Sequence, residues 1–166
     1  MSAFTVEKVV TRVSDTNVYA ANDVIGPATG ATAAFELPIV RGAMGIRIRS
    51  SLLVVQSSAV ISGETSYNLH LYSEAPASVF GDNAAWDLAS ADWGTFIGTI
   101  ALGTPADIGS SLVIATDTLD RFVYSKTGSL WAYLVTVGTY TPASGRVYRV
   151  RLSGELFPTL SNEVLD

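Results

Sequence analysis

The amino-acid sequence predicts an all-β protein, and three features carry that prediction. Short runs rich in Val, Ile, Thr, Tyr and Leu recur along the 166 residues, separated by clusters of Gly, Pro, Ser and Asp. The runs "GIRIRSS", "YNLHLY" and "VYRVRLS" alternate between apolar and polar positions with a period of two. Spacing typical of helices is scarce. We therefore expect antiparallel strands, most of which bury one face only.

The number of strands predicts the architecture. This many antiparallel strands in one domain's length fit a β-sandwich, of jelly-roll type first and of immunoglobulin-like type second. The chain has no cysteine, so the Cys–Trp–Cys pattern of true immunoglobulin domains is absent. The expected strands span residues 4–13, 18–24, 32–37, 45–61, 67–72, 95–102, 111–115, 121–124, 130–140 and 146–156.

Two runs, "SLLVVQSSAVI" and "LWAYLVTV", are apolar on both faces. Such a strand is covered on both sides, whereas a sandwich by itself covers only the inner faces of its sheets. The outer face of Trp131, Tyr133 and Val135 therefore needs a further cover, which either a flanking loop or a neighbouring subunit could supply. These three residues are candidate interface residues.

The stretch "SVFGDNAAWDLASADWGTFIG" offers one short helical excursion near residues 82–92. Asp82 can cap a helix over "NAAWDLASAD", where Ala, Leu and Trp recur at helix-compatible spacing. Trp86 and Trp93 would then anchor this helix to the sheet.

The acids of this stretch match the common catalytic and metal-binding patterns poorly. Asp82, Asp87 and Asp92 are spaced five and five residues apart, which does not fit an EF-hand calcium loop. Asp87 and Asp92 would diverge on a helix, so they make a poor pair for glycoside hydrolysis. A looser calcium site at Asp82 and Asn83 stays open as the lesser alternative.

Length and composition predict a single domain over residues 1–166. Residues 1–16 form either a strand or an N-terminal arm, and residues 158–166 follow a proline as a short C-terminal tail. The net charge is −5, and the ten basic residues form no run. We therefore expect neither a nucleic-acid partner nor a membrane partner.

The sequence predicts a protein that is not an enzyme. It has one histidine, His70, which we expect to be an ordinary surface or edge residue. No phosphate-binding loop and no G-x-S-x-G elbow is present. Accordingly no catalytic residue, cofactor or metal is assigned.

Arginine pairs offer a second set of candidate interface residues. The motifs "IRIR" and "YRVR" place Arg47 with Arg49, and Arg149 with Arg151, on one face of their strands. One interpretation is a solvated face balanced by local Glu and Asp. The other is a basic patch that meets carboxylates of another subunit.

Four segments in order, "NVYAANDVIG", "GIRIRSSLLVV", "LHLYSEAPASVFGDNAAWDLASAD" and "LWAYLVTVGTYTPASG", resemble a group of small virion structural proteins of tailed bacteriophages. The similarity spans roughly residues 17–153. It implies a jelly-roll β-sandwich on the particle surface, with capsid decoration, or cement, as the nearest role. It also implies synthesis in the host bacterial cytoplasm, the major capsid protein as partner, and a homotrimer.

Other functions stay open beside this one. Tail and fibre proteins use similar sandwiches, and Trp86, Trp93 and Trp131 could form a platform for carbohydrate. The exposure of these rings separates the alternatives, because sugar binding needs solvent-facing, coplanar rings.

Overall fold

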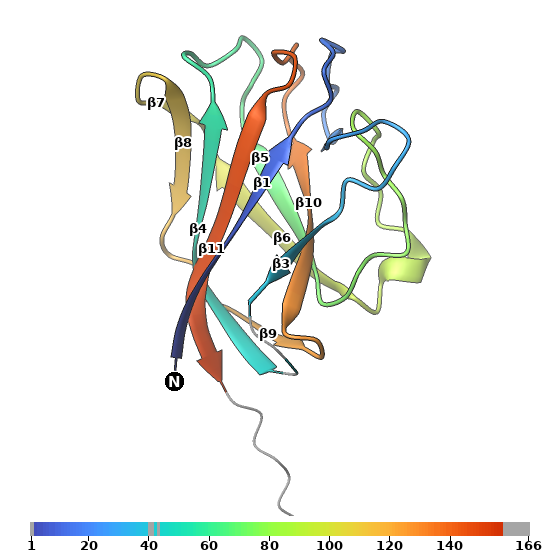
Figure 1. Ribbon diagram of the computed structural model, residues 1–166, viewed down its shortest axis with the longest axis vertical. Coiled ribbons are helices and arrows are strands. Elements are labelled where there is room, and N and C mark those ends of the chain that lie inside the picture. Colours follow the sequence, from blue (N-terminus) through green and yellow to red (C-terminus); the bar gives the residue numbers. More distant parts are fainter. Residues whose placement is uncertain (1, 40–41, 43, 158–166) are drawn as a thin grey trace, which may run out of the picture.

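The computed structural model describes residues 2–39, 42 and 44–157, which form a sandwich of two antiparallel sheets (Figure 1). The larger sheet contains β1 (Ser2–Thr11), β11 (Val147–Phe157), β4 (Met44–Gln56), β8 (Ser111–Thr116), β7 (Ala106–Asp107) and β9 (Arg121–Ser125). The smaller sheet contains β2 (Val24–Ile25), β3 (Phe35–Pro38), β10 (Ser129–Thr136), β5 (Tyr67–Tyr72) and β6 (Phe96–Gly103). The predicted all-β sandwich is confirmed.

The strand pairing is nested, and this nesting defines a jelly roll. β1 pairs with β11, β3 with β10, β4 with β8, and β5 with β6. The first principal strand thus pairs with the last and the second with the last but one, so the chain folds like a long rolled hairpin. The pairs alternate between the two sheets. Most contacts therefore join residues that are far apart in the sequence.

The inner faces of both sheets form the main core. Along β11, Tyr148, Val150 and Leu152 are buried, whereas Arg149 and Arg151 are exposed, as the period of two predicts. The core residues include Ile46, Ile48, Leu53, Leu69, Leu71, Leu130, Leu134 and Leu152, all fully buried. β10 is buried on both faces, because its other side contacts a second, smaller cluster of buried residues.

The helix expected over 83–92 is reduced to a single 3₁₀ turn at Ser90–Asp92. The preceding segment pairs with the chain around β2 instead. The amide of Val24 donates to the carbonyl of Ala84, and the amide of Trp86 donates to the carbonyl of Asn22. These pairings occupy groups that a helix would need for its own ladder, and Asn83 has a φ of 63°, which a right-handed helix does not allow.

Several strand boundaries also differ from the expectation. The expected strand 18–24 contracts to β2 and an isolated bridge between Tyr19 and Tyr140. β4 ends at Gln56, and β10 ends at Thr136. Residues 2–11 form β1 along β11, and the expected tail 158–166 lies outside the described residues. No helix in the described part of the chain is long and apolar enough to cross a membrane.

Candidate functional site

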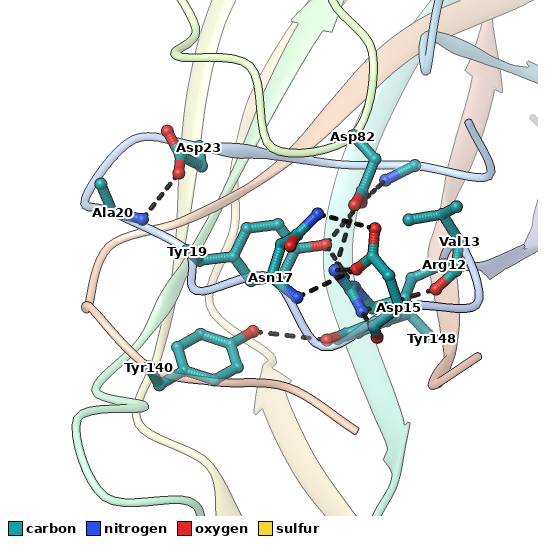
Figure 2. Close-up of polar contacts among 11 residues, drawn as sticks. Arg12, Val13, Asp15, Asn17, Tyr19, Ala20, Asp23, Asp82, Tyr140 and Tyr148 are labelled. Carbon is teal, nitrogen blue, oxygen red and sulfur yellow. Dashed lines mark hydrogen bonds and ion pairs between the residues drawn. The ribbon is translucent and has the colours of Figure 1, made fainter. Parts of the chain in front are cut away.

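A buried arginine closes one end of the sandwich. Arg12 follows β1, and its Nη2 lies 3.2 Å from Asp82 Oδ2 and 2.6 Å from Asp15 Oδ1 (Figure 2). Its Nε donates to the hydroxyl of Tyr19 at 2.9 Å, and that hydroxyl donates to Asp82 at 2.5 Å. The amide of Gly26 donates to the same carboxylate at 2.9 Å. Asp82 therefore joins distant segments and does not cap a helix, which corrects the role expected for it.

A second buried ion pair lies beside the first cluster. Nη1 and Nη2 of Arg146 lie 2.9 and 3.1 Å from the two carboxylate oxygens of Glu64. Tyr67 donates to Glu64, and the Tyr140 hydroxyl lies 3.2 Å from that of Tyr67 and 3.3 Å from that of Tyr148. Burial raises the pKa of Tyr140 to about 12, so its hydroxyl stays protonated at neutral pH.

The two clusters are contiguous, and we call them together the polar plug. Its members are Arg12, Asp15, Tyr19, Glu64, Tyr67, Asp82, Tyr140, Arg146 and Tyr148. The rings of Tyr19 and Tyr140 join them, with centroids 5.6 Å apart. Burial also raises the pKa of Tyr19. Each cluster sets a buried guanidinium against a carboxylate. Arg12 also donates to the Tyr19 hydroxyl and to the carbonyls of Val13 and Asp15, whereas Nε of Arg146 is buried without a hydrogen-bond partner among the described residues. Because the charges are compensated by neighbours, we assign the plug to holding loops together.

Strand alternation is the signal that could have revealed both buried arginines. Arg146 shares its parity with Tyr148 and Val150, which face the core, and not with the exposed arginines of the same strand. Arg12 likewise shares its parity with Val10. A charged residue in phase with the buried positions is a candidate for a buried ion pair, although Lys8 has the same phase on β1 and is exposed.

The acids of residues 82–92 do not converge on one site. Asp92 is buried and accepts the amides of Ala77 at 2.6 Å and Ser78 at 3.3 Å, which closes the loop on itself. Asp82 belongs to the plug, and Asp87 is exposed. Among the described residues, no group of three or more His, Cys, Asp or Glu side chains could hold a metal ion.

The chain itself covers the outer face of β10. Tyr133 and Val135 are fully buried, and the Tyr133 hydroxyl donates to the carbonyl of Ser78 at 2.7 Å. Trp131 is half-buried. The segment 73–95, which we call the cover loop, supplies Trp86 and Leu88 to this second cluster. Of the two covers considered from the sequence, the flanking loop is the one observed, so Tyr133 and Val135 present no surface to a partner.

His70 is buried beneath the cover loop, which corrects the expectation of a surface histidine. Its ring stacks on that of Trp86, and Nδ1 lies 2.7 Å from Thr99 Oγ1. Its Nε2 is buried without a hydrogen-bond partner among the described residues. Desolvation lowers the pKa of His70 to about 4, so the imidazole is neutral at physiological pH. The ring packs as an aromatic side chain.

The other four candidate interface residues lie on the outer face of the larger sheet. At one end, Arg47 holds Asp120 in a bidentate contact of 2.6 and 2.8 Å, and Arg49 Nη1 lies 3.7 Å from the same carboxylate. The hydrogen bond from Arg47 lowers the pKa of Asp120. Nη1 of Arg47 also lies 4.0 Å from Glu155 Oε2, so both arginines have carboxylate partners within the chain.

Arg149 and Arg151 are paired in the same way. Both donate to Glu7 on β1, and Nη2 of Arg151 lies 2.7 Å from Glu7 Oε2. The hydrogen bond from Arg151 lowers the pKa of Glu7. The outer face thus carries four guanidinium groups that share three carboxylates, those of Asp120, Glu155 and Glu7, so most of their charge is compensated within the chain.

Exposed aromatic side chains gather at the lower end of this face, on β9. Phe122 is 63% exposed and Tyr124 is 49% exposed. Phe122 packs edge-to-face against Phe157 with centroids 5.7 Å apart, and it lies over Gly45, where a side chain would meet its ring. We call Phe122, Tyr124 and Phe157 the β9 patch. The patch is an exposed apolar surface, and two of its three rings are held by packing within the chain.

An open groove of about 370 Å³ separates the edges of the two sheets. Trp131 forms one wall, and Lys8, Thr32 and Glu36 supply polar groups. An aromatic wall with a few polar side chains is typical of a small-ligand site.

The chain is therefore a jelly-roll β-sandwich. The cover loop packs on the outer face of the smaller sheet, and the outer face of the larger sheet is open. No family model and no curated protein matches its sequence. Among solved structures it is similar to a chain in the single-particle structure of maize chlorotic mottle virus, with 8% identity and a TM-score of 0.29 over 99% of this chain and 98% of that chain. It is also similar to the VP2 subviral particle of infectious bursal disease virus, with 14% identity and a TM-score of 0.19 over 96% and 43% of the two chains. Likenesses at this level carry no argument about function.

Proposed function

We propose that this chain is a non-enzymatic virion structural protein, a capsid decoration (cement) protein that binds the outer capsid shell as an oligomer and stabilises it. The fold supports this proposal, because jelly rolls serve in viral capsid proteins and also in lectins. The partner would be the major capsid protein, and the oligomer a homotrimer. A trimer presents each weak contact three times, which raises the avidity for a symmetric shell.

The open outer face of the larger sheet is the observation that carries the proposal. The outward-facing Leu52, Val54 and Val113 of β4 and β8 are half-buried, and the arginine–carboxylate pairs lie at either side. An apolar centre surrounded by a polar rim is typical of a protein-binding surface. Most of the charge of these arginines is paired within the chain, so burial against a shell would rest on shape and apolar area.

A binding assay on particles tests this proposal. Particles that lack the protein are mixed with the purified chain, and bound copies are measured by co-sedimentation together with the temperature at which DNA is released. We expect saturable binding and a higher release temperature. Leu52→Asp should weaken binding at least tenfold, whereas Val79→Ala, at a 66% exposed site on the cover loop, should not. Absence of binding by the wild-type chain would refute the proposal.

Carbohydrate binding is a second candidate, and the groove beside Trp131 favours it. Trp93 alone of the three tryptophans is strongly exposed, at 68%, and Trp86 is stacked on His70. The rings therefore form no shared platform, and the groove is the remaining location. A glycan array with the wild type and Trp131→Ala tests it: a glycan bound only by the wild type would support the groove, and an empty array would exclude this candidate.

A further inference from the structure

Most sheet edges in the described part of the chain carry a feature that discourages pairing with another strand. On β1, Lys8 occupies an inward position between Val6 and Val10 and leads into the groove. On β6, the guanidinium of Arg121 donates to the carbonyl of Thr99 at 3.1 Å. β3 ends in a proline and β7 is two residues long. Inward charges, proline and short length are known protections of a strand edge.

β9 is the exception to this pattern. It pairs with β4 on one side, and among the described residues no other strand pairs with its second side. Its outward side chains are the aromatic Phe122 and Tyr124 of the β9 patch. The charge of Arg121 does not guard this edge, because the side chain reaches across to β6. An exposed, apolar edge strand is a template for pairing with another chain.

We propose that β9 binds β9 of a second copy of this chain, antiparallel and edge to edge, across a two-fold axis at Val123. The two larger sheets would then form one continuous sheet. A two-fold contact uses the same surface on both copies, so it requires a strand that is complementary to itself.

The sequence of β9 and its flanks meets this requirement. With Val123 on the axis, Phe122 lies opposite Tyr124 of the second copy, and the reverse pair follows by symmetry. Two positions further out, beyond the ends of β9 and on the same face, Asp120 lies opposite Lys126 of the second copy. The side chains of Asp120 and Lys126 are 61% and 74% exposed, and their charges are opposite. Each is already paired within its own chain, Asp120 with Arg47 and Lys126 with Glu74, so the contact between copies would share these partners. Aromatic pairs and opposite charges are the cross-strand pairs that stabilise antiparallel sheets.

The contact is small, so we expect a reversible dimer that forms as concentration rises. It is independent of the shell-binding function proposed above, and it differs from a three-fold contact. The mass of the associated species separates the two, because a dimer reports on β9 and a trimer on the other contact. A failure of either proposal leaves the other unaffected.

Sedimentation velocity over a concentration series tests the location of the contact. The wild type should shift from monomer toward dimer, and Tyr124→Ala should weaken the association at least tenfold. Ile108→Ala, which shortens a 66% exposed apolar side chain away from β9, should match the wild type. A wild type that stays monomeric, or an association that Tyr124→Ala leaves unchanged, overturns the proposal. A monomer that dimerises only after removal of residues 158–166 also overturns it, because the chain's own tail would then occupy β9.

A charge exchange tests the register. Asp120→Lys and Lys126→Glu each place like charges opposite one another twice in a homodimer, so each variant alone should associate at least tenfold more weakly. In a mixed dimer, the lysine introduced at position 120 of one variant meets the glutamate introduced at position 126 of the other. The unchanged Lys126 of the first variant meets the unchanged Asp120 of the second. Both pairs are of opposite charge, so an equimolar mixture should recover the dimer.

Recovery also shows that both variants are folded, which thermal melting checks separately. Loss of association without recovery on mixing overturns the proposed register.

Discussion

His70 and Trp86 lie face to face, with ring centroids 3.6 Å apart and ring planes that differ by 1°. This stack joins β5 to the cover loop. It also removes the imidazole from water, and the Nε2 atom has no acceptor among the described residues. A neutral imidazole fits this environment and a protonated one does not. The packing of the cover loop therefore depends on the protonation of one side chain.

The free energy of unfolding should fall at acidic pH because of His70. Its pKa is lowered from 6.5 to about 4 in the folded chain, so the unfolded chain binds more protons between these values. Stability is fully present above about pH 6.5, decreases as the pH falls toward 4, and levels off below. The linkage amounts to roughly 3 kcal/mol or less. Urea unfolding at a series of pH values measures it.

His70→Gln is the control for that measurement, because Gln does not titrate and can still bind the Thr99 hydroxyl. The difference between wild type and variant should depend on pH only between about 4 and 6.5. Parallel stability curves for the two proteins would contradict the assigned role of His70.

Removal of Trp86 should raise the pKa of His70. Trp86→Ala opens the imidazole to water, so its pKa should return toward 6.5. The chain has one histidine, so its proton resonances report this pKa directly by NMR. The cover loop should also become more sensitive to limited proteolysis. An unchanged pKa in the variant would mean that groups other than Trp86 exclude water from His70.

Loss of Asp82 should destabilise the fold strongly. Asp82→Ala leaves the buried guanidinium of Arg12 with Asp15 alone and removes the acceptor of Tyr19. An uncompensated buried charge would cost about 3–5 kcal/mol, and the remaining pair with Asp15 keeps the loss below that. The buried Tyr19 hydroxyl and Gly26 amide lose their acceptor, at about 1–3 kcal/mol each. Chemical denaturation measures the change.

Asp87→Ala is the matched control, because Asp87 is an exposed acid in the same segment. Its effect should stay within about 0.5 kcal/mol. Equal effects of the two substitutions would show that the plug contributes nothing.

A methyl group at Gly154 should also destabilise the fold. Gly154 lies at a bulge between β11 and β4, and a Cβ there would be 1.9 Å from the carbonyl oxygen of Arg47 and 2.9 Å from Phe4 Cε1. Overpacking of this kind costs about 1–3 kcal/mol. Gly30→Ala, where nothing lies within 4 Å of the new Cβ, serves as the comparison. Thermal melts of both variants should differ; coincident melts would contradict the tight approach.

The sequence was sufficient to predict the sandwich and most of its strands, because alternation follows directly from burial of one sheet face. It was less informative for residues 82–92. Apolar spacing there fits a helix, but the backbone groups of this segment are used by the chain around β2. Such a partner is distant in the sequence, so local spacing cannot reveal it.

The candidate interface residues divide in the same way. The two-sided pattern of β10 correctly indicated a second cover, but periodicity does not say whether a loop or another subunit supplies it. Tyr133 is covered by the chain itself, whereas Arg149 stays on an open face. The sequence does not reveal the β9 patch, because a short run such as "RFVYS" does not indicate that only one edge of the strand is paired.

The pairing of the first strand with the last has a practical consequence for protein engineering. Ser2 lies opposite Leu156, so the beginning of β1 and the end of β11 adjoin at the same end of the sandwich (Figure 1). A short linker between residues 2 and 157 would turn these strands into an ordinary hairpin. The chain could then be opened at the exposed residues 58–60 as a circular permutant, with every sheet pairing retained.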